Sequence, residues 1–482
     1  MKTQLNTGWF GNMRMDILSG ITVALALIPE AIAFSIIAGV DPMVGLHASF
    51  CIAVVIAFAG GRPGMISAAT GAMALLMVTL VRDHGLEFLF AATILTGILQ
   101  VLFGVLKIGK LISFVPQSVM NGFVNALAIL IFVSQLTHFT GQSWVMYALV
   151  ALTLLIIYLL HRLTKAVPSA LAAIIVVSLL AIGLGLNVNT VGDMGELTRS
   201  FPIFHIPQVL LNWDTLMIIF PYSLSLALVG IMESLLTATI VDDMTDTPSD
   251  KNREVRGQGL ANVVTGFFGG MAGCAMIGQS VINVKSGGRT RLSTLIAGIF
   301  LLFLILVLGD VVKMIPMAAL VGVMFMVSIG TFNWGSLTAI RKIPVGDTLV
   351  MATTVAIVLI THDLSLGVIT GVVLSALIYA GRSAKLAISR TSAHNRTTYR
   401  VTGQFFFATT TKFSQAFAYL SDSDTVVIDF GSSHVWDHSA VTAIAKVVQK
   451  YEALGKTVQI EGLNEESRNL IEKIGLTASA GH

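Results

Sequence analysis

Two glutamates lie inside long apolar stretches of the sequence, where an ionisable side chain is least expected. Glu30 lies within the stretch 17–38, and Glu233 lies within the stretch 215–241. Carboxylates at membrane depth are costly, so those found there usually have a function. Burial disfavours the charged form of a carboxylate, which lets it take up and release a proton. Glu233 is therefore the leading candidate for coupling a proton to another process, with Glu30 as its competitor.

Two short, glycine-containing stretches indicate where that process takes place. Residues 67–81 and 275–285 are each the third apolar segment of a set of seven, and both are weak as ordinary spans. Interrupted segments at matching positions in two halves are typical of inverted-repeat transporters, which bind substrate at the broken helices. The predicted helix starts, at 70–72 and 275–277, would turn unpaired N–H groups toward each other. Such a pair can bind an anion without any arginine.

The candidate substrate site gathers around these two helix starts. Thr70 offers a hydroxyl donor, and Gly71 lets the backbone approach a ligand closely. Phe34 follows Glu30 by one helical turn and can form a wall of the site. The predicted substrate-binding residues are Glu30, Phe34, Thr70, Gly71, Ala72, Met276, Ile277 and Gln279.

Membrane helices must position these residues. The 482 residues are 55% hydrophobic and 11% charged, with a mean hydropathy of +0.84, whereas soluble domains carry roughly 25% charged residues. This composition excludes a soluble enzyme over most of the chain. The net charge of +3 gives no reason to expect nucleic acid as a partner. Cys51 and Cys274 lie in apolar stretches and are interpreted as inert packing residues, and we expect no metal site or cofactor.

Fourteen spans are predicted, seven on either side of a polar stretch at residues 189–214. Lys and Arg are divided fifteen to three between the loops on the two sides, so the positive-inside rule places both termini in the cytoplasm. Because seven is odd, the second repeat (215–381) must be inverted relative to the first (15–187). The predicted spans are 17–38, 43–60, 67–81, 86–106, 117–136, 144–161, 168–187, 215–241, 257–271, 275–285, 291–309, 314–332, 346–361 and 364–381.

The end of the chain has a different character. The last 101 residues hold 20 of the 55 charged side chains, which indicates a water-soluble tail. We divide the chain into a transmembrane domain (1–381), a linker (382–397) and a tail domain (398–482). Alternating strands and helices predict a small α/β domain for this tail. Its expected strands are 398–401, 404–408, 425–430 and 457–460, and its expected helices are 439–454 and 465–474.

The tail resembles a STAS domain, the module shared by sulfate transporters and anti-sigma factor antagonists. The matching piece is the strand 426–430, the loop 435–439 and the helix that follows. By this resemblance Ser439 corresponds to the serine that antagonists phosphorylate, a modification that adds about −1.5 to −2 charges. The neighbours His438 and Ala440 differ from the usual Ser-Gly surroundings. We therefore expect Ser439 to be a structural helix cap, with a regulatory phosphate as the alternative.

The membrane part resembles the sulfate permease family, also called SulP or solute carrier family 26. The resemblance extends over essentially the whole chain, with the motifs in family order. It implies a fold of fourteen segments arranged as a core and a gate, a homodimer, small anions as substrates and a cytoplasmic partner for the STAS domain. The motifs lie at residues 28–34, 67–73, 233–237, 257–262, 268–270 and 283–290.

The chain departs from the family at positions that bear on the substrate. Many relatives carry an arginine where this chain has Gln279, and often a glutamine where it has Glu30. Sodium-coupled bicarbonate carriers resemble this chain at Thr237, but they have an aspartate in place of Glu233. They also use a threonine where this chain has Ile277. Glu233 and Thr237 are thus the candidate ion-coupling residues, for a proton or alternatively for sodium, and the oxygen missing at Ile277 weakens the sodium hypothesis.

Together these features predict a secondary active transporter of an inorganic or small organic anion in the cell membrane, and not an enzyme. Bicarbonate, sulfate and dicarboxylates are the candidate substrates, and a proton is the expected co-transported ion. The core domain is expected to move by an elevator mechanism. The alternatives are a sodium-coupled bicarbonate symporter, an uncoupled exchanger or channel, a signalling protein that acts through its tail, and a carrier of an uncharged nucleobase bound by Gln279 and Glu233.

Overall fold

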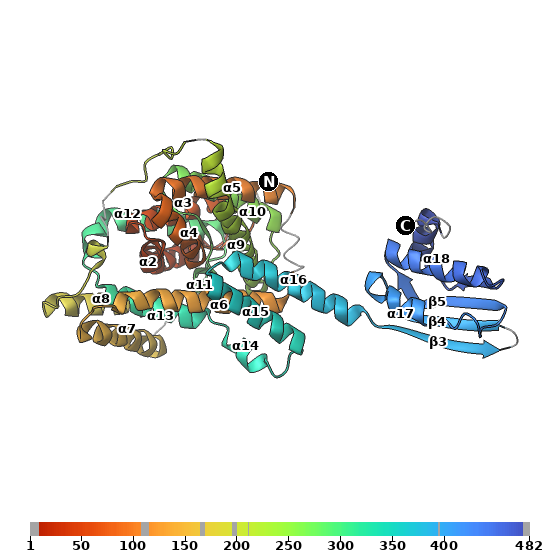
Figure 1. Ribbon diagram of the computed structural model, residues 1–482. Coiled ribbons are helices and arrows are strands. Elements are labelled where there is room, and N and C mark those ends of the chain that lie inside the picture. The colour runs from red at the N-terminus through yellow and green to blue at the C-terminus, as the bar shows by residue number, and fades with distance from the viewer. Residues whose placement is uncertain are drawn as a thin grey trace. The chain divides into compact units, whose positions relative to one another are not determined.

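The first of two units, residues 1–372, is built almost entirely from helices, whereas the second, residues 373–482, combines a sheet with helices. Figure 1 shows the elements of both units. The computed structural model describes residues 9–107, 115–163, 169–194, 200–210, 212–393 and 396–475.

The helices of the described residues follow the predicted spans. Eight of them are long and apolar enough to cross a membrane, and three shorter ones are also apolar. The count of fourteen crossings stays a prediction. The first half contains α2 (Met13–Ala38), α3 (Pro42–Ala59), α4 (Gly71–His84), α5 (Leu86–Val105), α6 (Gln117–Leu136), α7 (Trp144–Leu163) and α8 (Ser169–Gly183). The second half contains α9 (Trp213–Thr245), α10 (Lys251–Phe267), α11 (Ile277–Lys285), α12 (Arg291–Lys313), α13 (Met317–Thr331), α14 (Trp334–Ala339), α15 (Val345–Thr361) and α16 (Leu364–Ser383).

The third segment of each half is broken as the sequence predicts. Strand β1 (Ser67–Ala69) leads into α4, and strand β2 (Gly273–Ala275) leads into α11. The two strands pair antiparallel, with Ala68 opposite Cys274. Thr70 and Met276 are the N-cap residues of the two short helices. The predicted helix starts are confirmed, and the antiparallel pair brings them together in the middle of the unit.

The helices of this unit form two groups (Figure 1). Helices α2–α5 and α9–α12 pack on one another and carry the β1–β2 pair, and α6, α7, α8, α13 and α15 form the other group. Within the first group, α5 and α10 approach closely at Gly97 and Gly259. A Cβ on Gly97 would lie 2.4 Å from the carbonyl oxygen of Gly259, so this crossing requires glycine. The first group matches the expected core and the second the expected gate.

The second unit contains a four-stranded sheet in the order β3-β4-β5-β6. The first pair is antiparallel, and the other two pairs are parallel. Phe405, Phe413 and Phe430 are fully buried in its core. Its elements are β3 (Leu386–Ala393), β4 (Arg396–Phe405), α17 (Thr410–Gln415), β5 (Thr425–Val435), α18 (His438–Glu452), β6 (Thr457–Glu461) and α19 (Glu465–Ile474).

Two expectations about the tail are corrected. Strand β3 occupies most of the predicted linker 382–397, because it completes the sheet by pairing with β4 along its whole length. The two short strands expected at 398–401 and 404–408 are instead parts of the single strand β4, which contains a bulge between residues 400 and 402. A bulge interrupts the alternation of apolar residues, so one strand can look like two in the sequence.

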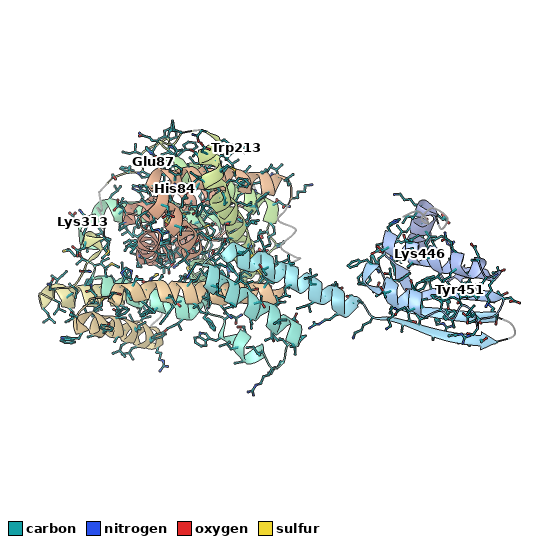
Figure 2. The ribbon with its side chains drawn as sticks, in the orientation of Figure 1. His84, Glu87, Trp213, Lys313, Lys446 and Tyr451 are labelled. Atoms are coloured by element: carbon teal, nitrogen blue, oxygen red, sulfur yellow. The ribbon has the colours of Figure 1, made fainter. Side chains whose placement is uncertain are left out.

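The helix cap expected at Ser439 is also wrong. Helix α18 begins at His438, and Asp437 is its N-cap. The Asp437 carboxylate accepts hydrogen bonds from the backbone N–H groups of Ala440, at 2.8 Å, and Phe407, at 2.7 Å. Ser439 lies in the first turn and is exposed. The ionised carboxylate two residues earlier therefore satisfies the helix end. Figure 2 shows Lys446 and Tyr451 on the same helix.

Candidate functional site

All eight predicted substrate-binding residues line one cavity of about 700 Å³ between the two helix groups. Helices α2, α4, α9 and α11 supply one wall, and α6 and α13 supply the other. The cavity extends to the end of the bundle where α6 begins and α13 ends, and Gln117 and Trp334 lie exposed at that mouth.

The two helix starts turn backbone groups without helical partners toward the cavity. Neither Thr70 nor Met276 makes a side-chain cap bond to its own helix. The first backbone bonds of the two helices run from Ala74 N–H to the Thr70 carbonyl and from Ser280 N–H to the Met276 carbonyl. The N–H groups of residues 71–73 and 277–279 therefore have no helical partner. Both helix dipoles place their positive ends at the same point.

One of the two glutamates contacts the predicted substrate residue Gln279. The Gln279 side-chain nitrogen donates to Glu30 Oε1 at 2.7 Å. Pro29 lies within α2 and Glu30 follows it, so the carboxylate sits beside a point where the helix lacks a backbone donor. Gln279 is in the first turn of α11. This contact ties the first span to the second broken helix.

The other glutamate is held by a residue interpreted from the sequence as inert packing. The Cys274 thiol donates to Glu233 Oε2 at 2.9 Å, and Cys274 Sγ also lies 3.2 Å from Thr70 Oγ1. Cys274 is fully buried in β2. Cys274 therefore does more than pack, because the strand pairing brings its sulfur between a cap hydroxyl and a carboxylate; its chemical inertness stays a prediction.

The paired strands are supported by polar side chains that sequence reasoning did not assign to the site. The Ser234 hydroxyl accepts from Ala275 N–H at 3.1 Å. Asn262 exchanges two hydrogen bonds with the backbone of Gly273, at 2.9 and 3.1 Å, and Gln258 donates to the Ser67 hydroxyl at 2.5 Å. All of these side chains are fully buried. Gln258 and Asn262 belong to the motif at 257–262, so the sequence singled out these residues. It did not show that they bind β1 and β2.

Of the two predicted ion-coupling residues, Glu233 lines the cavity and Thr237 does not. The Thr237 hydroxyl donates to the backbone carbonyl of Glu233 at 2.7 Å. This bond is the usual local bond of a helical threonine. Ile277, which lines the cavity, offers only a hydrocarbon side chain at the position where the resemblance to sodium-coupled carriers implies a threonine oxygen.

The charge around the cavity is unusual for an anion site. Among the described residues that line it, Glu30 and Glu233 are the ionisable ones, and no lysine, arginine or histidine is present. The two glutamates are 9% and 8% exposed. All positive potential must therefore come from backbone N–H groups and helix ends, and two ionised carboxylates would oppose it.

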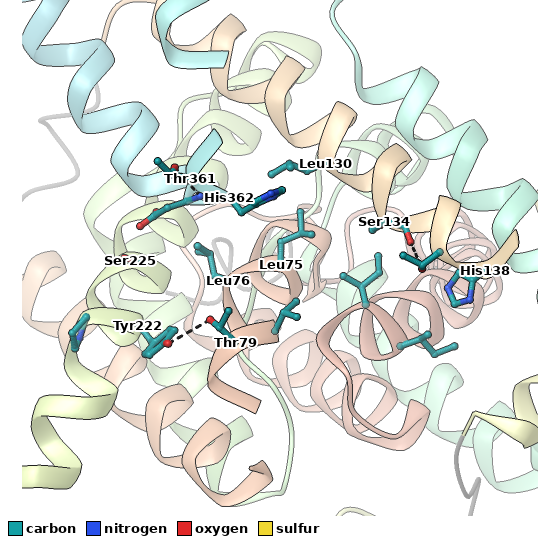
Figure 3. Close-up of a pocket in the computed structure, with 16 residues that line it drawn as sticks. Leu75, Leu76, Thr79, Leu130, Ser134, His138, Tyr222, Ser225, Thr361 and His362 are labelled. Carbon is teal, nitrogen blue, oxygen red and sulfur yellow. Dashed lines mark hydrogen bonds between the residues drawn. The ribbon is translucent and has the colours of Figure 1, made fainter. Parts of the chain in front are cut away.

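A second cavity is lined by other turns of α2, α4, α6 and α9. A Cβ placed on Gly71 would lie 2.9 Å from Phe34 Cε1 and 3.0 Å from Ile131 Cδ1. The second cavity, of about 650 Å³, reaches the opposite end of the bundle, where α6 and α15 end (Figure 3). Figure 3 shows His138 and His362 at its edges and a 3.4 Å bond from Thr79 to Tyr222. Phe34 thus forms the predicted wall.

The segment that joins the two halves is anchored on α5. Both oxygens of Glu87, labelled in Figure 2, lie about 3 Å from His205 Nε2, at 3.0 and 2.9 Å. The Glu87 carboxylate also accepts from Gln208 N–H at 2.6 Å. The described part of the connection, 200–210, is thereby fastened at the end of the bundle where α4 ends and α5 begins.

Comparisons with known proteins agree with this architecture. Residues 13–146 and 142–354 match the family model described as "Sulfate permease family", and residues 387–480 match the model described as "STAS domain". The Bacillus subtilis protein named "Putative sulfate transporter YbaR" is 60% identical over 471 residues, which cover 98% of each chain. The "Bicarbonate transporter BicA" of Picosynechococcus is 26% identical over 97% of this chain and 92% of its own.

Solved structures show the same fold. The transmembrane domain of a cyanobacterial bicarbonate transporter, BicA, superposes with a TM-score of 0.66 at 27% identity, covering 76% of this chain and 98% of that one. The transporter SLC26A9 superposes with a TM-score of 0.85 at 17% identity, covering 98% of this chain and 88% of that one. The expected fold class, a helical membrane transporter followed by a STAS domain, is confirmed.

Proposed function

Because the chain belongs to the sulfate permease family of anion transporters, we propose that it is a proton-coupled carrier of a small oxyanion. The family transports its substrates across a membrane and performs no covalent chemistry on them, so the chain is not an enzyme. Sulfate and bicarbonate are the substrates that the names of its relatives suggest, and dicarboxylates complete the set of candidates.

The observation that carries this proposal is the pairing of two uncapped helix starts with two glutamates in one cavity, whose described lining residues include no basic side chain. The helix ends attract an anion, whereas an ionised glutamate beside them repels it. A proton on Glu233 removes that repulsion, so proton binding and anion binding favour each other. The same protein can then carry both inward and release both together.

We propose that an elevator-type movement of the first helix group exposes the site alternately to the two sides of the membrane. The anion-binding helix starts and both glutamates belong to one helix group, and α6 and α13 of the other group close the cavity. Phe34 and Ile131 both lie against Gly71 and form the proposed seal at one end, while Gln117 and Trp334 lie at the open end. Sliding the first group past the second would move the seal and open the cavity of Figure 3 instead.

Orientation and assembly complete the proposal. The fifteen-to-three bias of Lys and Arg places both termini in the cytoplasm, so the cavity that holds the glutamates faces inward. We place the chain in the cell membrane as a homodimer, as the resemblance to the family implies, with the STAS domain available to a cytoplasmic partner.

Uptake into proteoliposomes tests the proposal. Labelled sulfate, bicarbonate and a dicarboxylate are offered under an imposed proton gradient, an imposed sodium gradient or neither. We expect an inward proton gradient to drive accumulation of one of these anions, with no stimulation by sodium. Accumulation driven by sodium alone would support the alternative through Glu233 and Thr237 and would refute proton coupling.

A further inference from the structure

The three residues Thr70, Cys274 and Glu233 form a continuous chain of hydrogen bonds from the cap of α4 to the candidate proton carrier. Thr70 Oγ1 lies 3.2 Å from Cys274 Sγ, and Cys274 Sγ lies 2.9 Å from Glu233 Oε2. Cys274 is fully buried, and Thr70 and Glu233 both line the cavity. The sulfur is thus inaccessible, while both ends of the chain reach the site.

We propose that Cys274 is a positioning residue that transmits the protonation of Glu233 to the anion site through the hydroxyl of Thr70. This inference rests on the proposed proton coupling and adds the physical connection between its two partners. A thiol can donate one hydrogen bond and accept another, and either atom of the Thr70–Cys274 pair can be the donor.

The charge on Glu233 sets which atom donates in each hydrogen bond between Glu233, Cys274 and Thr70. When Glu233 is ionised it only accepts, so the Cys274 S–H points to the carboxylate and the Thr70 O–H points to the sulfur. The Thr70 lone pairs then face the cavity and repel an anion. No donor is left for the substrate at this position.

Protonation reverses the chain without transfer of a proton through the thiol. The incoming proton forms the O–H bond of the Glu233 carboxylic acid, and this O–H donates to Cys274 Sγ. The S–H rotates to donate to Thr70 Oγ1, and the Thr70 O–H rotates into the cavity. The anion gains a hydroxyl donor at the moment that a negative charge disappears.

Among the neighbouring titratable groups, Glu233 is the one that sets the direction of these hydrogen bonds. Cys274 contacts its carboxylate directly, and Glu30 shares the cavity from α2. The remaining charged or titratable side chains on α9 and on the elements packed against it, apart from Tyr222 and Arg256, lie in the first or last turn of their helices. They are Arg82, Asp83 and His84 of α4, Glu87 of α5, Asp214, Tyr222, Asp242 and Asp243 of α9, Lys251, Arg253, Glu254 and Arg256 of α10, and Lys285 of α11.

The test measures how anion affinity depends on pH in the full-length protein. Binding of sulfate, nitrate and bicarbonate to the wild type is measured first, with bicarbonate concentrations corrected for pH, and the tightest of the three is used for every variant. Cys274→Ala breaks the chain, Cys274→Ser keeps a group that donates and accepts, and Thr70→Val breaks the chain from its other end. Cys51→Ala removes the other buried cysteine as the matched control.

One hydrogen bond gained on protonation predicts about tenfold tighter binding at about pH 6 than at about pH 8 in the wild type and in the Cys51→Ala variant. Cys274→Ala and Thr70→Val should reduce this ratio to about twofold, and Cys274→Ser should restore it. A merely structural role would weaken binding equally at both pH values. If Cys274→Ala keeps the wild-type ratio of affinities at the two pH values, the role of Cys274 is overturned but the proposed proton coupling is not. If the anion affinity of the wild type does not depend on pH, the proposed proton coupling is overturned as well.

Discussion

Substitution of Gly71 tests whether the anion binds between the two helix starts. The Cβ of an alanine at this position would lie 2.9 Å from Phe34 Cε1 and 3.0 Å from Ile131 Cδ1, closer than the 3.4–4 Å of ordinary contacts. Both neighbours are buried, so the strain must be relieved by moving the wall of the cavity or by shifting the start of α4. Overpacking of this kind costs about 1–3 kcal/mol.

The consequence for binding can be derived from that cost. If the variant relieves this strain while no anion is bound, anion binding must restore the strain. The dissociation constant of the anion should then rise by roughly 5- to 150-fold in Gly71→Ala. Gly71→Leu should abolish binding, because a whole side chain would fill the gap between the helix starts. The control is Gly183→Ala, whose added Cβ meets no atom within 4 Å.

The assay is equilibrium binding of the labelled anion to purified protein, with gel filtration to confirm that each variant has folded. We expect Gly71→Ala to elute like the wild type and to bind weakly, and Gly183→Ala to bind normally. Affinity of Gly71→Ala within about twofold of the wild type would refute the placement of the site at these helix starts.

Three further predictions concern orientation and the tail domain. A cysteine at Ile203 should react with an impermeant reagent added outside the cell, and a cysteine at Ala453 should not. The two native cysteines are buried and should give no background labelling. Labelling at both positions would contradict the orientation. Asp437→Ala should lower the stability of the tail domain by about 1 kcal/mol, and Ser439→Ala should change it by less than about 0.5 kcal/mol; denaturant titration of the full chain measures both. The Gly431 N–H holds the pKa of Asp429 below its ordinary value, with help from a neighbouring arginine, so Asp429→Asn should destabilise the domain at pH 7. That difference should disappear as the pH falls through the lowered pKa, since the native stabilisation exists only above it; an equal loss at acidic pH would contradict the assignment.

The broken helices could be predicted from the sequence because their signal is local. Each of the two segments has small residues, a short apolar run and the same position within its half, and the structure places helix starts at Gly71 and Ile277 as expected. The gathering of Glu30, Glu233 and Gln279 around one cavity followed from these starts. Local chemistry and repeat symmetry were therefore sufficient to predict a group of residues that lines one cavity.

Contacts between distant segments could not be predicted in the same way. Cys274 contacts Glu233 across 41 positions of sequence and Thr70 across 204, and the direction of its thiol depends on the pairing of two three-residue strands. Strand β3 was missed because its burial alternates at only one end. The cap at Asp437 was missed because the sequence analysis placed the helix start one residue too late, at Ser439, and only the backbone could show that α18 begins at His438.

The buried charges beside the first unit's helix ends show the same limit. Residues 242–256 are densely charged in the sequence, yet the Asp242 carboxylate pairs with Arg62 at 3.0 Å and with Lys251 at 2.6 Å. Glu254 is fully buried and accepts from the backbone N–H of Arg62 at 2.9 Å. Charge density predicts exposure on average, but a charge that finds partners can be buried.

Accumulation by Glu233→Gln in proteoliposomes tests the central claim most directly. Glu254→Gln is the matched control, since Glu254 is also a fully buried glutamate but does not line the cavity. We predict that Glu233→Gln binds the anion without pH dependence and no longer accumulates it under an inward proton gradient, while Glu254→Gln still does. If Glu233→Gln accumulates the anion against its gradient with the pH dependence of the wild type, Glu233 does not couple the proton and the proposed mechanism is wrong.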